Sequence, residues 1–154
     1  LMHLEIDYPG AETELAVLKL TRNEALNTAP VNAPSLSQHD IFSARKALLE
    51  IHLDENLEQY LVELVIATRQ PQKYSKQLAS WIEFGASPRA TIALDKCARA
   101  HAWLMGRDFV GPDNIQAVLH NVLRHRLLLS YEAEAEGVTS NQVLDSILQL
   151  VPVP

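Results

Sequence analysis

Residues 85–90, which read Gly-Ala-Ser-Pro-Arg-Ala, constrain the fold of this chain more than any other stretch. Ser87 is a good N-cap residue, and Pro88 suits the first helical position, where a missing N–H leaves no helical hydrogen bond unmade. Gly106 lies where a left-handed C-cap would end the same helix. The sequence therefore predicts a central helix from residue 88 to about residue 105.

Arg89 occupies the second position of that helix, where the helix dipole disfavours a cation by up to about 1 kcal/mol. A guanidinium beside the free N–H groups of a helix start is suited to meet an anion. An arginine in a first turn is also commonly just an exposed surface residue. Taken alone, the residues leave both interpretations open.

Further start and stop signals divide the rest of the chain into short helices. Ser37 with Asp40, Asp54, Gly111 with Pro112, and Thr139 with Gln142 are all typical of helix starts. Leu36 and Ile41 have the spacing of a hydrophobic staple around the first of them. We expect helices over residues 11–26, 37–49, 54–68, 88–105, 112–123 and 139–150.

Two short segments have the pattern of extended structure. Residues 2–7 alternate apolar and polar side chains, which predicts a half-buried strand, and residues 51–53 are expected to pair with it. Residues 27–35 carry prolines and small polar residues and are expected to form a loop, while residues 70–80 show no clear period. The predicted fold class is mainly α, a small helical bundle with one or two short extended segments.

The amino-acid composition excludes several classes of protein. The 154 residues suffice for one domain with a real core, and the net charge of −6 provides no basic field for nucleic acid. Cys97 is the only cysteine, which excludes an internal disulfide and favours a reducing compartment. No apolar run approaches the roughly 20 residues of a membrane span, and the first residues lack a signal-peptide pattern. We expect a cytoplasmic protein with no nucleic-acid partner.

Most familiar catalytic motifs are missing. No glycine lies in a phosphate-binding loop, and no zinc-protease or serine-hydrolase motif occurs. His101, His120 and His125 are better explained as structural or surface histidines than as metal ligands, so no metal site is expected. Cys97 lies on an apolar helical face and is expected to be an inert, buried thiol.

The roles of two charged segments are not decided by the sequence. Arg124 and Arg126 flank His125 and suit either an anion or a partner's carboxylate, or they neutralise nearby helix C-termini. Glu132, Glu134 and Glu136 are most simply a solvated acidic run.

Several motifs that follow one another along the chain resemble the C-terminal lid of the MoxR-family AAA+ ATPases. The main motifs are residues 85–90, 106–110, 112–115 and 122–127. Four further segments also match the family, namely residues 8–9, 61–69 (which end in Ala67-Thr68-Arg69), 134–137 and 151–154. The resemblance covers nearly the whole chain. It implies that residues 9–154 form a helical lid domain and that residues 1–8 are the last strand of an upstream AAA+ core. The chain begins inside that alternating segment, so we expect it to be a piece of a longer protein.

The resemblance also implies a function. Arg89 matches sensor 2 of the family, which reaches the γ-phosphate of ATP, and Ser87 and Pro88 accompany it at the nucleotide. The full-length protein is then expected to be an ATPase that binds ATP and Mg²⁺, forms a hexameric ring and does chaperone-like remodelling with von Willebrand factor A-domain partners. This chain alone is expected to be non-catalytic and to bind no cofactor. Gly111 departs from the family, which more often has a hydroxyl-bearing cap there.

Two other function classes remain for comparison. One is a free-standing helical adaptor that binds proteins and has no nucleotide role. The other is a helical DNA-binding module, suggested by the short turn between the helices that start at Pro88 and Pro112, and disfavoured by the net charge of −6.

Overall fold

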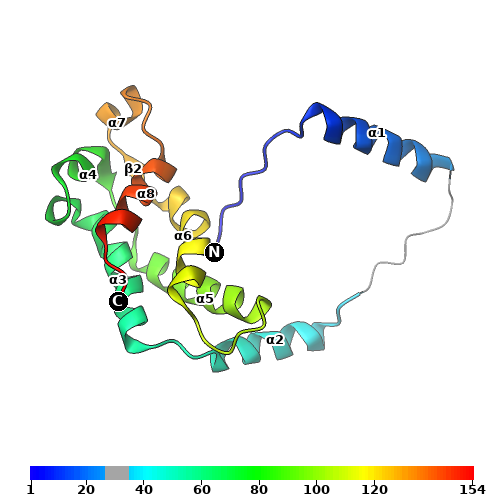
Figure 1. The fold of residues 1–154 in the computed structure, drawn as a ribbon, viewed down its shortest axis with the longest axis horizontal. Helices are drawn as coiled ribbons and strands as arrows, with labels where there is room; N and C mark the ends of the chain where they lie inside the picture. Colours follow the sequence, from blue (N-terminus) through cyan, green and yellow to red (C-terminus); the bar gives the residue numbers. More distant parts are fainter. Residues whose placement is uncertain (27–34) are drawn as a thin grey trace.

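The computed structural model describes residues 1–26 and 35–154, and helices dominate it (Figure 1). The described elements are α1 (Ala11–Leu26), α2 (Gln38–Glu50), α3 (Glu55–Arg69), η1 (Pro71–Lys73), α4 (Lys76–Trp81), β1 (Ile82–Phe84), α5 (Pro88–Leu104), α6 (Pro112–Leu123), η2 (Arg124–Arg126), β2 (Leu128–Leu129), α7 (Tyr131–Ala135) and α8 (Ser140–Leu150). The predicted mainly α bundle with small extended segments is confirmed. Most of the expected loop over residues 27–35 lies outside the described residues. None of the described helices is long and apolar enough to cross a membrane.

The helix starts follow the capping residues that the sequence provides. The Asp40 N–H donates to the Ser37 hydroxyl at 3.2 Å, and the Ser37 N–H donates back to the Asp40 carboxylate at 2.9 Å. Thr139 and Gln142 exchange the same pair of bonds at the start of α8. These reciprocal bonds satisfy N–H groups that a helix cannot pair internally. The staple is not formed, because the Leu36 side chain is 76% exposed.

A side chain from the first turn of α6 binds the backbone of Gly111, the residue that precedes the helix. Asn114, which is fully buried, accepts the Gly111 N–H on its side-chain oxygen at 2.8 Å. Asn114 also contacts the His101 ring at 3.0 Å, which joins the start of α6 to the last turn of α5. The Asn114 N–H, which a hydroxyl-bearing cap residue would bind, donates instead to the Gly111 carbonyl at 3.1 Å.

Helix α5 lies at the centre of the hydrophobic core and packs along α3 and α6. Its buried face consists largely of alanines, Ala90, Ala93 and Ala98 among them, whose small side chains let the neighbouring helices approach closely. Larger buried side chains fill the space around it, namely Tyr60, Leu64, Leu94, Ile115, Leu119 and Ile147.

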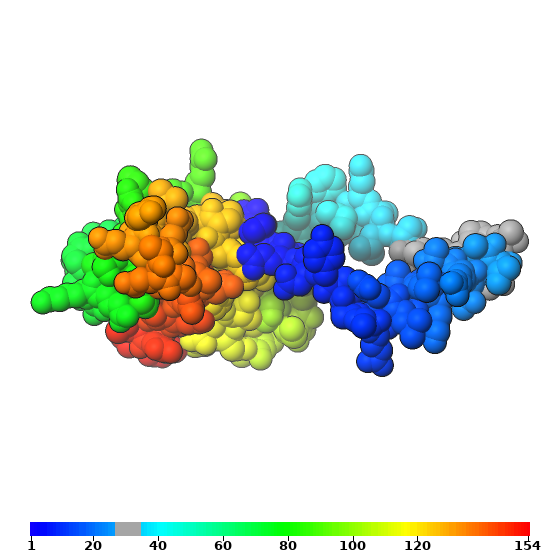
Figure 2. All heavy atoms as spheres, turned by 90° about the horizontal axis from the view of Figure 1, so that it is seen from above, coloured from blue at the N-terminus to red at the C-terminus, as the bar shows by residue number. Residues whose placement is uncertain are grey.

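The helices α1 and α2 have no buried residue. Helix α1 extends away from the other helices, and α2 lies at the edge of the bundle (Figures 1 and 2). Apolar side chains of α1 are about half exposed, namely Leu15, Val17, Leu18 and Leu20. The compact core is therefore built from residues beyond α2.

The extended segments differ from those expected. Residues 1–10 contain no strand, and residues 51–53 pair elsewhere: the His52 N–H donates to the Asp108 carbonyl at 2.9 Å, and the Val110 N–H donates to the His52 carbonyl at 2.8 Å. The turn after α5 offers His52 a complete backbone partner, whereas residues 2–7 meet no sheet to join. The assignment of residues 1–8 to an upstream core stays a prediction.

The small sheet is formed by two segments that the sequence did not single out as strands. β1 and β2 are antiparallel, with Ile82 opposite Leu129 and Phe84 opposite Leu128. Residues 70–80, which lacked a clear period, form η1 and the short helix α4, capped by the Ser75 hydroxyl. The acidic run overlaps α7, which is also short. Segments this brief carry too few residues for periodicity to identify them.

Substitution of Gly106 tests the predicted left-handed end of α5. Gly106 has φ +72° and no atom within 4 Å of an added Cβ, so an alanine there strains only the backbone. We expect Gly106→Ala to lower the free energy of unfolding by about 1–2 kcal/mol in urea titrations. Gly106→Asn should lose less, because asparagine tolerates this conformation. Equal stability of Gly106→Ala and the wild type would contradict the assignment.

Candidate functional site

The start of α5 presents three exposed residues, Ser87, Pro88 and Arg89. Ser87 has the extended backbone of an N-cap (φ −71°, ψ 167°), and Pro88 is the first helical residue, as predicted. The Ser87 hydroxyl makes no capping bond, which differs from the expected role of its side chain. The Ala90 N–H instead donates to the Ser87 carbonyl at 2.8 Å, which uses the group that the hydroxyl would otherwise cap.

Arg89 has no hydrogen-bond or ion-pair partner among residues 1–26 and 35–154. Its guanidinium is therefore held out into solvent beside a helix N-terminus and an uncommitted hydroxyl. Arginine carries a planar fork of donors that matches phosphate oxygens. The helix dipole adds positive potential at the same place. The chemistry available here is the binding of an anion from outside the described chain.

The residues before the helix start are anchored to the end of α3. The Ala86 N–H donates to the Thr68 hydroxyl at 2.9 Å, and Thr68 donates in turn to the Val65 carbonyl at 2.7 Å. The Arg69 guanidinium donates to the Ala86 carbonyl. Thr68 is fully buried and Ala86 nearly so. Both backbone polar groups of Ala86 are thus satisfied by side chains from the last turn of one neighbouring helix.

Gly85 is required by how closely these two segments approach. A Cβ at Gly85 would lie 2.2 Å from the Thr68 carbonyl oxygen and 2.8 Å from the Arg69 nitrogen. Both are backbone atoms, so a side chain cannot be accommodated without moving a whole segment. The sequence pattern pointed to the helix start but gave no role to Thr68 or Arg69. No local signal marks an interaction between residues 18 positions apart.

The arginines of η2 bind the end of a helix, as one of their two interpretations predicted, and Arg124 also pairs with a carboxylate of this same chain. Arg124 donates to the His120 carbonyl at 3.2 Å and Arg126 to the Val122 carbonyl at 2.8 Å, so both bind the C-terminal end of α6. Arg124 also forms an ion pair with the Glu5 carboxylate. The His3 and His125 rings meet edge to face with 5.6 Å between centroids. Burial, followed by the nearby charge of Arg126, lowers the pKa of His125.

The candidate histidines lie in separate surroundings. His101 contacts Asn114, His120 contacts the Asp145 carboxylate at 2.9 Å, and His125 contacts His3. The described part of the chain contains no group of three or more residues placed to hold a metal ion.

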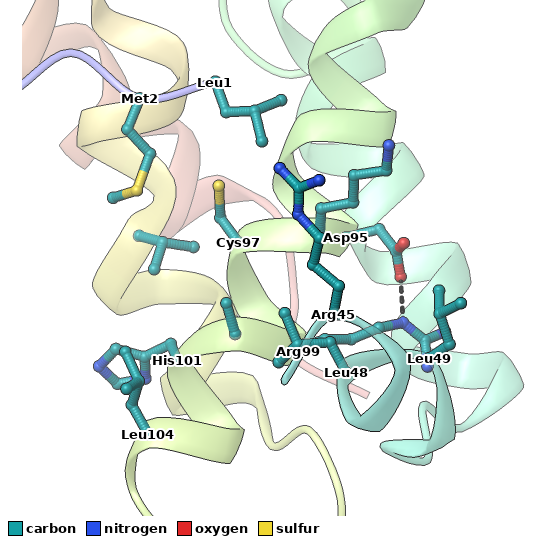
Figure 3. Close-up of a pocket in the computed structure, with 13 residues that line it drawn as sticks. Leu1, Met2, Arg45, Leu48, Leu49, Asp95, Cys97, Arg99, His101 and Leu104 are labelled. Carbon is teal, nitrogen blue, oxygen red and sulfur yellow. Dashed lines mark hydrogen bonds and ion pairs between the residues drawn. The ribbon is translucent and has the colours of Figure 1, made fainter. Parts of the chain in front are cut away.

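A hollow of about 920 Å³ lies between α2, α5 and the first two residues (Figure 3). Its lining is mostly apolar, with charged side chains that include Arg45 and the paired Asp95 and Arg99. Cys97 points toward Leu1 in this view and is only 7% exposed. Burial raises the pKa of its thiol, in keeping with the predicted buried, unreactive cysteine.

Comparisons of the sequence with known proteins match it to a lid-domain family and to proteins named MoxR. The AAA lid domain family matches residues 78–147. The chaperone MoxR1 of Mycobacterium tuberculosis is 33% identical over all of this chain and 40% of its own length, and the protein YeaC of Bacillus subtilis is 33% identical over all of this chain and 45% of its own. MoxR of Paracoccus denitrificans is 36% identical over 67% of the chain. The chain therefore spans less than half the length of these curated relatives.

A solved structure shares the fold. A crystal structure of a protein from Cytophaga hutchinsonii, classed provisionally as an ATPase, superposes with a TM-score of 0.90 at 37% sequence identity. The similarity covers 99% of this chain and 46% of the other. The arrangement of the helices is thus the one adopted by that longer protein.

Removal of the Thr68 hydroxyl tests the anchor of the candidate site. Thr68→Val leaves the buried Ala86 N–H without an acceptor, which should lower the free energy of unfolding by about 1–3 kcal/mol in urea titrations. Thr21→Val is the matched control, because the Thr21 hydroxyl donates only to the Val17 carbonyl on the exposed helix α1. Its effect should stay within about 0.5 kcal/mol. A similar loss of unfolding free energy in the two variants would contradict the role of the Thr68 hydroxyl as an anchor.

The lowered pKa of His125 predicts a pH dependence of stability. The ordinary pKa of 6.5 applies to the unfolded chain and a lower one to the folded chain, so unfolding takes up a proton between the two values. The free energy of unfolding should therefore fall as the pH drops below about 6.5. Urea titrations from about pH 7.5 to about 5.5 would measure it, and His125→Asn should flatten the profile. His39→Asn, on the exposed α2, should leave the profile unchanged; an unchanged slope in His125→Asn would refute the prediction.

Proposed function

Because this chain belongs to the MoxR family of AAA+ ATPases and carries its AAA lid domain, we propose that it closes over ATP bound by the rest of the full-length protein. Arg89 is the sensor 2 residue in this proposal and contacts the γ-phosphate, with Ser87 and Pro88 at the same helix start. The observation that carries the proposal is the exposed, unpaired Arg89 guanidinium on a helix start anchored to α3, among the residues that the structure describes.

The chemistry of the helix start fits a phosphate. A charge-assisted hydrogen bond to a phosphate oxygen contributes about 1.5–3 kcal/mol. The anchor on Thr68 and Arg69 fixes the backbone from which Arg89 projects, so little order has to be gained when phosphate arrives. As the bond to the γ-phosphate breaks, Arg89 stabilises the charge that develops on its oxygens.

In this proposal the chain contributes only part of the ATP-binding site of the full-length protein. The phosphate-binding loop, the Mg²⁺ ion and the residue that activates water belong to the part of the protein outside this chain. We propose that the full-length protein acts as a hexameric ring and couples ATP hydrolysis to chaperone-like remodelling, with a von Willebrand factor A-domain protein as a partner. The family membership supports the nucleotide. The ring and the partner rest on the resemblance alone, and the cytoplasmic location in this proposal rests on the single cysteine and the absence of a signal-peptide pattern.

Replacement of Arg89 in the full-length protein tests the sensor role. Arg89→Ala should lower kcat for ATP hydrolysis by about tenfold to a hundredfold, the equivalent of one lost charge-assisted bond. Arg89→Lys should recover only part of the rate, because lysine keeps the charge and loses the planar fork. Steady-state phosphate release and nucleotide-dependent assembly are the measurements.

Lys76→Ala is the matched control for this experiment. Lys76 is likewise an exposed cation in the first turn of a helix, but that helix is α4. Its turnover should equal that of the wild type. The sensor assignment is wrong if Arg89→Ala retains both wild-type turnover and wild-type assembly.

A further inference from the structure

A second arginine, Arg69, lies at the start of α5, although it is the last residue of α3. Its Nε donates to the carbonyl of Ala86, the residue before the N-cap Ser87. One peptide bond joins that carbonyl to Ser87, so the Arg69 Nε lies within about 5 Å of the Ser87 Cα. The packing of α3 against α5 therefore brings Arg69 to the same helix start that carries Arg89 (Figure 1).

The Arg69 guanidinium uses only one of its donor nitrogens within the described chain. Nε is bound to Ala86, while Nη1 and Nη2 have no hydrogen-bond or ion-pair partner among residues 1–26 and 35–154. A guanidinium is planar and carries its N–H groups in a fixed fork, so the bond at Nε limits the directions of the other donors. Arg69 is also exposed. It therefore presents outward donors that are already partly oriented.

The other unused donors at this helix start belong to Ser87 and Arg89. The Ser87 hydroxyl makes no capping bond, and the backbone N–H groups of both residues donate to none of the described residues. No carboxylate in the described part of the chain pairs with Arg69 or Arg89. Two like charges at the positive end of a helix dipole repel one another, and an anion between them relieves this repulsion.

The charge of a terminal phosphate suits two arginines better than one. Such a group carries a charge of about −1.5 to −2 at pH 7 and has three acceptor oxygens. Arg89 supplies one positive charge and a fork that can bind two oxygens. Arg69 supplies a second charge and further donors from the same chain. Together they match both the charge and the number of oxygens.

We propose that Arg69 is a second phosphate-binding arginine of the ATP site, and that its Nη1 and Nη2 bind the γ-phosphate together with Arg89. This inference rests on the proposed function, because it takes ATP as the ligand of this helix start. One guanidinium then does two things: its Nε holds the Ala86 carbonyl, and its outward nitrogens hold the phosphate. A nucleoside diphosphate lacks the γ-phosphate, so Arg69 strengthens the binding of the triphosphate selectively.

Nucleotide binding by the full-length protein tests the role of Arg69. Arg69→Gln should weaken the binding of adenylyl imidodiphosphate, a non-hydrolysable ATP analogue, by about tenfold, because it removes a charge-assisted bond to the γ-phosphate. The affinity for ADP should stay within about twofold of the wild type. Arg69→Lys should give an intermediate result, because lysine keeps the charge and loses the planar fork. Calorimetric titration with each nucleotide measures the dissociation constants.

Combination with Arg89→Ala separates a direct contact from a positioning role. If Arg69 only held the backbone that carries Arg89, Arg69→Gln would have no effect once the Arg89 guanidinium is removed. A direct contact predicts that Arg69→Gln still weakens binding of the ATP analogue by about threefold or more in the Arg89→Ala protein. Absence of this further loss overturns the proposal.

Lys73→Gln is the matched control, because it removes one positive charge from an exposed residue of η1 four positions after Arg69. Its affinities for both nucleotides should equal those of the wild type. A wild-type ratio of the two affinities in Arg69→Gln also overturns the proposal, and Arg69→Lys decides in the same way should Arg69→Gln fail to fold. If Arg89→Ala alone weakens binding of the ATP analogue, only the role of Arg69 is wrong. If neither variant weakens it, the proposed contact of Arg89 with the γ-phosphate is wrong as well.

Discussion

The hydrogen bond from the Ala86 N–H to the Thr68 hydroxyl is the interaction on which the rest of the structure depends most. It lies in a fully buried position, and the absence of a side chain at Gly85 lets the two backbones approach closely enough to make it. The Arg69 guanidinium completes the junction at the Ala86 carbonyl. This junction fixes where α5 begins, and the position of α5 in turn determines how α3 and α6 pack around it.

The same junction explains how an arginine is tolerated where the helix dipole opposes it. Arg89 is exposed, so water reduces the unfavourable interaction with the helix N-terminus. Its backbone is held by contacts that do not involve its own side chain, so the guanidinium is free to bind elsewhere. A residue with this combination of fixed backbone and unpaired charge is suited to a ligand that another part of the protein brings to it. The family membership identifies that ligand as a nucleotide in our proposal.

Local signals in the sequence predicted the helices well and the extended segments poorly. Ser37, Thr139 and Gly106 act within one turn of their own position, and the structure confirms the helix boundaries that they indicated. The pairings of His52 with Phe109 and of Ile82 with Leu129 join residues 47 or more positions apart, which no periodicity records. For the site, the position of Arg89 was predictable, whereas its anchor on Thr68 was not. The sequence also did not predict that Arg124 pairs with Glu5, because these two residues are 119 positions apart.

Helix α5 carries the candidate site at its first turn and is packed against the core along its length. Arg89 lies in its first turn, Cys97 lies near its middle, and its last turn leads into the segment that pairs with His52. The alanines along its buried face leave little space for the helix to bend or slide against α3 and α6. A displacement of the Arg89 backbone must therefore move the whole helix together with its neighbours.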